Sequence, residues 1–168
     1  MTNIRSVHST DHLRGAWRVT GPIDAFINTA LNSAIPWFFL RDVDSLPLWE
    51  FPSAYTFFGP MVACVLLFTV LSGYRNGTIW SRPMSATTRS WLMPGAALGM
   101  LSAGVGSLVF LGALIVLARG APEPLLSSTS VILTNGLMAG LLGYAGQVAG
   151  VFVACRRESN PSSDITPS

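Results

Sequence analysis

Four long apolar runs, separated by short polar segments, constrain this chain more than any other feature of its sequence. They lie at about residues 21–40, 54–74, 93–118 and 129–154. A helix needs about 20 mostly apolar residues to cross the roughly 30 Å hydrocarbon core of a bilayer, because it rises about 1.5 Å per residue. Each run is long enough, so the sequence predicts an all-α membrane protein with four transmembrane helices.

The composition excludes several other classes of protein. Of the 168 residues, 50% are hydrophobic and only 11% are charged, less than half the roughly 25% typical of a soluble domain. Ten basic residues, all of them Arg, face eight acidic ones. A strongly basic face cannot be built from so few charges, so we expect the lipid bilayer as a partner and no nucleic acid.

The order of polar and apolar segments predicts three regions. We expect a cytoplasmic N-terminal tail at 1–18, a four-helix transmembrane domain at 19–157, and a disordered cytoplasmic C-terminal tail at 158–168. The first span is expected to begin with Gly21 as its cap and Pro22 at its first helical position. Pro94 is expected to open the third span.

The distribution of arginines predicts the orientation in the membrane. The N-terminal tail, the 75–92 loop and the start of the C-terminal tail hold eight of the ten: Arg5, Arg14, Arg18, Arg75, Arg82, Arg89, Arg156 and Arg157. Arginines near helix ends favour the cytoplasmic side, so both termini are expected there. Abundant Arg without any Lys is typical of a GC-rich bacterial genome, and we therefore expect a multi-pass protein of the bacterial inner membrane.

The two halves of the chain share a few features. The first and third spans end at Arg41 and Arg119, and each is followed by a Pro-Leu pair, at 47–48 and 124–125. Two similar helical hairpins of the same orientation would give this pattern, as internal repeats often do in membrane folds. Because the match is short, an independent origin of the hairpins stays open.

A polar stripe inside the first span is the main candidate site. Asp24, Asn28 and Asn32 follow one another at intervals of four, so they share one helix face. One interpretation is a proton or substrate site with Asp24 as the titratable group. The other, which we favour, is structural: Asp24 stabilises the start of the helix, and the asparagines bond to neighbouring helices. Asn135 and Gln147 of the fourth span are expected to join such bonds, one of them with Asn28 or Asn32.

Glycines at intervals of four form the second candidate feature. They let helix backbones approach closely inside a membrane. We expect the third and fourth spans to pack on each other through them, with a homodimer seam or a docking face for a partner subunit as alternatives. The glycines are Gly95, Gly99, Gly136, Gly140, Gly146 and Gly150.

Motifs for chemistry are missing from the sequence. No span contains His, so paired haem ligands are not available, and there is no CxxC pair, HExxH, GxSxG or phosphate-binding loop. We expect no catalytic residues, no metal site, no cofactor and no enzyme activity.

One part of the chain resembles a known group of proteins. The residues are Asn28, Asn32 and Trp37, then Pro47-Leu48-Trp49, then a Phe-x-x-Pro segment ending at Pro60. They look like a set of uncharacterised small bacterial four-span proteins, loosely called permease-like. The resemblance covers the first hairpin and implies transport. An acidic residue often present before the Phe-x-x-Pro segment is replaced here by Ala54 and Tyr55.

Two functions remain in view. The first is an accessory or structural subunit, or a scaffold, acting as a homo-oligomer or with a membrane-protein partner. The alternative is a small oligomeric transporter or channel that uses the face of Asp24, Asn28 and Asn32.

Overall fold

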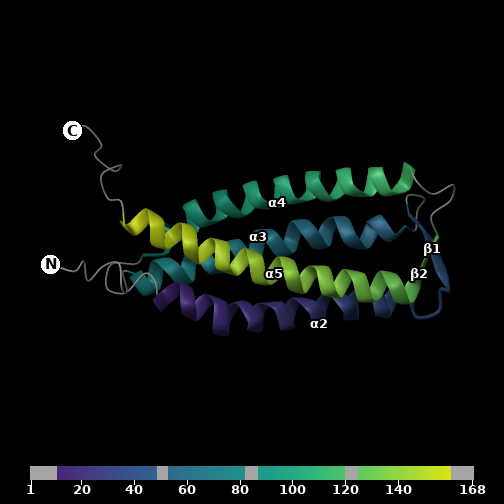
Figure 1. Cartoon of the computed structure of the whole chain (residues 1–168), viewed down its shortest axis with the longest axis horizontal. Coiled ribbons are helices and arrows are strands. Elements are labelled where there is room, and N and C mark those ends of the chain that lie inside the picture. The colour runs from purple at the N-terminus through teal and green to yellow at the C-terminus, as the bar shows by residue number, and fades with distance from the viewer. Residues whose placement is uncertain (1–10, 49–52, 82–86, 120–124, 160–168) are drawn as a thin grey trace.

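The computed structural model describes residues 11–48, 53–81, 87–119 and 125–159 (Figure 1). Four long helices dominate: α2 (Gly21–Leu40), α3 (Ala54–Ser81), α4 (Thr88–Arg119) and α5 (Ser128–Ser159). Three of them, α3 to α5, are long and apolar enough to cross a membrane. The prediction of an apolar, helical, membrane-embedded chain is confirmed at this level.

The helices extend beyond the apolar runs that predicted them. The segment 75–92 was expected to be polar and outside the spans, yet α3 continues to Ser81 and α4 begins at Thr88. Pro94 therefore lies inside α4 and does not open it. Most of the tail expected at 158–168 lies outside the described residues.

Gly21 does not cap α2. Residues 11–15 are helical and lead into η1, a π-helix over Ala16–Thr20, which runs directly into α2. Gly21 has φ −60° and ψ −52°, and its backbone N–H donates to the carbonyl of Ala16. The described part of the predicted N-terminal tail is thus helical, since the carbonyls of η1 accept bonds that a helix start would leave unmade.

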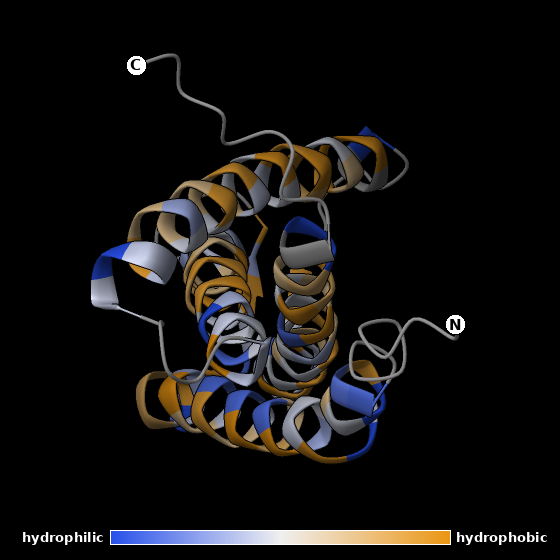
Figure 2. Cartoon of the chain, turned by 90° about the vertical axis from the view of Figure 1, so that its left-hand side faces the viewer, coloured by the Kyte–Doolittle hydropathy of each residue, from blue (hydrophilic) through white to orange (hydrophobic). Residues whose placement is uncertain are grey.

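The four helices lie in the spatial order α4, α3, α5, α2, which differs from their order in the chain. Viewed from one end, α3 and α5 form the centre, with α4 on one side and α2 on the other (Figure 2). The main interfaces are α3 with α5, α2 with α5, and α3 with α4. The expectation that the third and fourth spans pack on each other is wrong, because α3 separates α4 from the main body of α5.

A two-stranded antiparallel sheet joins the loops at one end of the bundle (Figure 1). Strand β1 (Ser45–Pro47) pairs with β2 (Leu125–Ser127), with Leu46 opposite Leu126. The backbone N–H of Ser128 extends the pairing by donating to the carbonyl of Asp44 at 3.0 Å. Leu46 is only 1% exposed and belongs to the apolar cluster at this end, so the sheet closes the bundle.

An approximate two-fold relation connects the hairpin α2–β1–α3 with the hairpin α4–β2–α5. In each, the outer helix packs on the inner helix of the other hairpin, and the two strands pair antiparallel. Adding one constant to the residue numbers of the inner helix α3 gives their counterparts in the inner helix α5. A second constant relates the outer helix α2 to the outer helix α4 in the same way. Three contacts between α4 and α3 have counterparts between α2 and α5. Gly99–Leu67 corresponds to Gly21–Tyr144, Gly106–Leu66 to Asn28–Gly143, and Phe110–Phe58 to Asn32–Asn135. This is the arrangement expected of a duplicated hairpin.

Candidate functional site

Small residues bring the backbones of α3 and α5 together at the centre of the fold. A Cβ atom on Gly150 would lie 2.6 Å from the backbone nitrogen of Tyr74 and 2.9 Å from the carbonyl carbon of Gly73. One on Gly77 would lie 2.7 Å from the Cβ of Ala154. Only glycine fits at these places, so the crossing depends on close backbone packing, which replaces the hydrophobic drive that lipid removes.

The sequence analysis missed two of these glycines. Gly73 and Gly77 are four residues apart, like the pairs that were recognised, but Arg75 and Asn76 stand between them. Gly73 lies inside the predicted second span at 54–74, but those polar residues placed Gly77 outside it. The interval of four was the available signal, and it carries more information here than the hydropathy around it.

The six predicted glycines serve three interfaces within the chain. Gly146 and Gly150 face α3, and Gly136 and Gly140 face Ser33 and Thr29 of α2. Gly95 and Gly99 face Leu71 and Leu67 of α3. A homodimer seam or docking face built from these six glycines would have to displace a neighbouring helix of the same chain.

The polar stripe of α2 faces α5, but the side chains of Asn28 and Asn32 donate to backbone carbonyls of α2 itself and not to a neighbouring helix, as had been expected. The Nδ2 group of Asn28 donates to the carbonyl of Asp24 at 2.7 Å, and that of Asn32 donates to the carbonyl of Asn28 at 2.9 Å. Across the interface, Nδ2 of Asn135 donates to the carbonyl of Asn32 at 2.7 Å. The structure thus places Asn135 against the stripe and makes it a link between α5 and α2.

Asp24 has a different environment from the one expected. Because the helix continues upstream through η1, the carboxylate is not at the start of a helical run. Its backbone carbonyl accepts the bond from Asn28, while its carboxylate has no hydrogen-bond partner among the described residues. The helix-start role proposed for Asp24 therefore has no support in the geometry.

Four side chains of η1 and α5 have buried polar atoms without a hydrogen-bond partner in the described part of the chain, and one of them is Oγ of Ser128 at the sheet end. Neither Nε2 nor Oε1 of Gln147 is bonded, although this residue is 0% exposed. The Oδ1 atom of Asn135 and the Oγ1 atom of Thr20 are also without partners. Buried polar groups are paired in the great majority of cases, so this interface is unusual.

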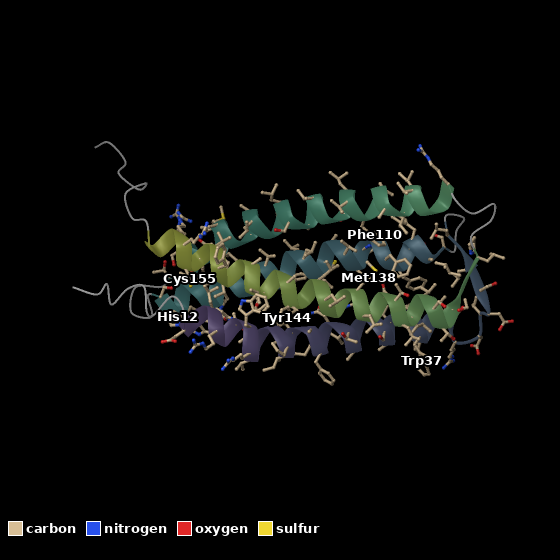
Figure 3. All side chains as sticks on the ribbon, viewed as in Figure 1. His12, Trp37, Phe110, Met138, Tyr144 and Cys155 are labelled. Atoms are coloured by element: carbon tan, nitrogen blue, oxygen red, sulfur yellow. The ribbon has the colours of Figure 1, made fainter. Side chains whose placement is uncertain are left out.

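Nitrogen-tipped side chains gather at the end of the bundle where η1 and the end of α5 lie (Figure 3), and two aromatic contacts connect η1 and the helical residues before it to the bundle. The Tyr144 ring meets that of Trp17 edge-on, with centroids 5.5 Å apart, and its hydroxyl donates to the Trp17 carbonyl. The His12 ring stacks on Trp80 at 5.8 Å. Six described arginines belong to this end: Arg14, Arg18, Arg75, Arg89, Arg156 and Arg157. This pattern is typical of a membrane–water interface.

The described residues contain no group of three or more His, Cys, Asp or Glu that could hold a metal ion. Neither Cys64 nor Cys155 forms a disulfide bond in the described part of the chain. Sγ of Cys155 lies 3.9 Å from Oγ of Ser81, which brings the ends of α3 and α5 together.

Comparisons with known proteins add no relative to this picture. No protein-family model matches the chain, and neither a curated protein nor a solved structure matches it. The resemblance to permease-like proteins stays a prediction.

Proposed function

We propose that this chain is a four-span membrane protein that acts as an accessory or structural subunit of a membrane assembly, without catalytic activity. This proposal rests mainly on the directions in which the polar and apolar side chains of α2 and α4 point. The stripe of Asn28 and Asn32 is turned inward and bonded to backbone carbonyls, while large apolar side chains face outward on α2 and α4.

The outer face of α2 supports its assignment as the fourth span. This helix has 20 residues, enough to cross the hydrocarbon core. Its polar stripe lowers its overall hydropathy, but that stripe packs against α5. The side chains that point away from the bundle are apolar and exposed: Ile23, Phe26, Ile27, Leu31, Ile35, Phe38 and Phe39.

The orientation follows from the positions of the charges. Six described arginines lie at the end that holds η1 and the end of α5, whereas Arg41 and Arg119 lie at the sheet end beside Asp42 and Asp44. The positive-inside rule then puts both termini in the cytoplasm and the β1–β2 sheet outside it. The composition favours a bacterial inner membrane.

Helix α4 presents a large apolar surface that no other described helix covers. Only 11% of its most apolar window is buried within the chain, against 39% in α3 and 44% in α5. Gly104 and Gly112 lie on this helix with nothing within 4 Å of a Cβ position. A partner helix can approach closely at such glycines, so α4 is the side on which we place the partner subunit.

A pair of matched substitutions tests the role of α4. Gly104→Leu fills open space, so the folded chain should keep its thermal midpoint while losing a stoichiometric partner. Leu101→Ala shortens an exposed side chain at the same level of α4 without adding bulk and should keep the partner. The subunit proposal fails if the chain purifies as a lone monomer from its own membrane in both variants and in the wild type.

One observation favours the transporter alternative. The Asp24 carboxylate of α2 and the Gln147 carboxamide of α5 are unpaired among the described residues, and ionisable groups inside membrane spans often mark solute or proton pathways. Flux measured with Asp24→Asn in proteoliposomes tests this alternative. Its loss in a correctly assembled variant would replace the subunit proposal.

A further inference from the structure

Tyr74 and Arg75 connect α3 to both of its neighbours near the end of the bundle that holds η1. The Tyr74 ring lies 3.3 Å from the Cβ position of Gly95 in α4, and its hydroxyl accepts a 3.1 Å bond from Nη1 of Arg157 in α5. The guanidinium of Arg75 lies over the ring of Trp91 in α4, 5.5 Å from the ring centroid. Trp91 precedes Gly95 by one turn, so both lie on one face of α4. Contacts with α4 thus hold both Tyr74 and Arg75, and Arg157 joins them from α5.

The opposite side of the bundle shows that helix packing does not require these polar residues. The constant that relates α3 to α5 makes Val151 the counterpart of Tyr74, Phe152 that of Arg75, and Trp80 that of Arg157. Val151 is 0% exposed and belongs to an apolar cluster against which Trp80 packs. Apolar contacts therefore close the bundle on that side, and the arginines on the α4 side have a role beyond packing.

Arg75 presents its charge at the surface of the bundle. Its side chain is exposed, and the contact with Trp91 positions the guanidinium without using its N–H donors. Within the described ranges, no hydrogen bond or ion pair uses this guanidinium, and neither α3 nor α4 contains an acidic residue. A guanidinium offers five N–H groups in one plane and binds two oxygens of a phosphate side by side. Arg75 is therefore held ready for an anion.

The start of α4 adds to the positive potential beside Arg75. Helix α4 begins at Thr88, so Trp91 lies in its first turn, together with the exposed Arg89 and without any acidic residue. The N–H groups at a helix start carry partial positive charge and favour anions. Both helices that meet at the Arg75–Trp91 contact thus attract a negative group.

The exposed face of α3 becomes apolar directly below Arg75. Phe68 lies seven residues before Arg75 and is 63% exposed, and Cys64, four residues earlier, is also exposed. Intervals of seven and four keep the three side chains on one face of the helix. A phospholipid has the same order of groups, with a charged phosphate above an apolar chain, whereas a free phosphate ion would make no contact with Phe68.

We infer that an anionic phospholipid of the cytoplasmic leaflet binds here, with its phosphate on Arg75 and one acyl chain along Phe68. Trp91 orients the guanidinium, and Arg157 adds a second positive charge from α5. Basic sites between membrane helices on the cytoplasmic side bind anionic headgroups in this way. The inference rests on the membrane placement and orientation proposed above and is independent of the subunit role.

Native mass spectrometry of the full chain in detergent tests this site. It measures the binding of added phosphatidylglycerol, of phosphatidylcholine with the same acyl chains, and of inorganic phosphate. We expect the wild type to prefer phosphatidylglycerol. Arg75→Gln should weaken that binding about fivefold, the loss expected for one arginine near an anionic surface, and leave phosphatidylcholine binding unchanged. Arg18→Gln is the matched control, because Arg18 is an exposed arginine of η1 at the same end, and it should keep the wild-type affinity.

The outcomes separate the inference from the proposals around it. Equal affinities for the two lipids, or equal losses in Arg75→Gln and Arg18→Gln, would overturn it, as would displacement of the lipid by millimolar inorganic phosphate. Phe68→Ala leaves every charge in place and should weaken the binding of both lipids; unchanged binding would also overturn the inference, even if Arg75→Gln does not fold. A chain that stays monodisperse in water without detergent would contradict the membrane placement itself. The predicted lipid preference in a chain without a partner subunit would contradict only the subunit proposal and support this inference.

Discussion

Gly150 of α5 lies directly against the backbone of Gly73 in α3, so that a Cβ on Gly150 would be 2.9 Å from the carbonyl carbon of Gly73. The two residues correspond to each other under the two-fold relation between the hairpins. The closest backbone approach in the fold thus occurs where the halves meet, and the interface between them is the one most sensitive to added volume.

Gly73→Leu should destabilise the folded chain severely. Its Cβ would collide with the backbone carbonyl of Gln147, and backbone cannot move aside as a side chain can. Overpacking costs about 1–3 kcal/mol and sometimes more, so we expect the upper end of that range. The thermal midpoint in detergent measures the effect. Gly112→Leu, on the open face of α4, should leave the thermal midpoint unchanged. Equal losses in both variants would contradict the close backbone packing of α3 on α5.

Asn135→Leu should have a modest effect on stability. The substitution removes the bond from Nδ2 to the carbonyl of Asn32, and hydrogen bonds between membrane helices contribute about 0.6 kcal/mol on average and up to about 2 kcal/mol. It also removes the unpaired Oδ1 atom, which offsets part of the loss. Reversible unfolding in bicelles measures the difference. A loss as large as that of Gly73→Leu would show that Asn135 has a larger role than one bond.

Cysteines at positions 45 and 127 should form a disulfide bond. Ser45 and Ser127 are opposite each other in the sheet, at the Cα separation of about 4.4–6.8 Å that a disulfide accepts. If the sheet faces an oxidising compartment, the bond should form in cells without added oxidant. Gel mobility with and without reductant detects it, in a background with both native cysteines replaced.

Pairing Ser127→Cys with Val43→Cys is the control for that experiment. Residue 43 lies outside β1 and should not be linked. A disulfide in the control but not in the 45–127 pair would contradict the register of the strands. A 45–127 bond that forms only with added oxidant would indicate that the sheet lies in the cytoplasm, which is opposite to the orientation proposed here.

Asp24→Asn should leave the yield, thermal midpoint and native mass of the protein unchanged under the subunit account. Asparagine has nearly the same shape, and the backbone carbonyl that accepts from Asn28 is retained. Size-exclusion chromatography with a melting curve measures these properties. A large fall in folded yield would restore a structural role for the carboxylate in α2.

Much of the secondary structure could be predicted from the sequence, because long apolar runs without charge have few other folds open to them. The bounds of α2 agree with the predicted first span at 21–40, since Arg41 and the proline and acidic residues after it end the apolar pattern. The upstream helix was missed because its residues are polar and Gly21-Pro22 is typical of a helix start.

The spatial order of the helices was beyond the sequence analysis for a physical reason. Helices α3 and α4 are apolar on all sides, so hydropathy does not distinguish a face that meets lipid from one that meets a helix. Short strands such as β1, with Pro47 at its end, have no alternating pattern of their own. They form because Leu46 is buried between the loops.

The candidate site was predicted in its residues but not in its setting. The interval of four between Asp24, Asn28 and Asn32 correctly put them on one face, and Asn135 does meet Asn32. The unpaired state of Gln147 depends on which helix faces it. That information exists only in the packing of α5 between α2 and α3.

The native mass of the protein, extracted gently from its own membrane with every co-purifying chain identified, tests the proposed function most directly. The subunit account predicts a complex in which a different membrane protein is present at fixed stoichiometry and is lost in Gly104→Leu but retained in Leu101→Ala. A lone monomer, or a homo-oligomer that transports a solute only while Asp24 is intact, would contradict it.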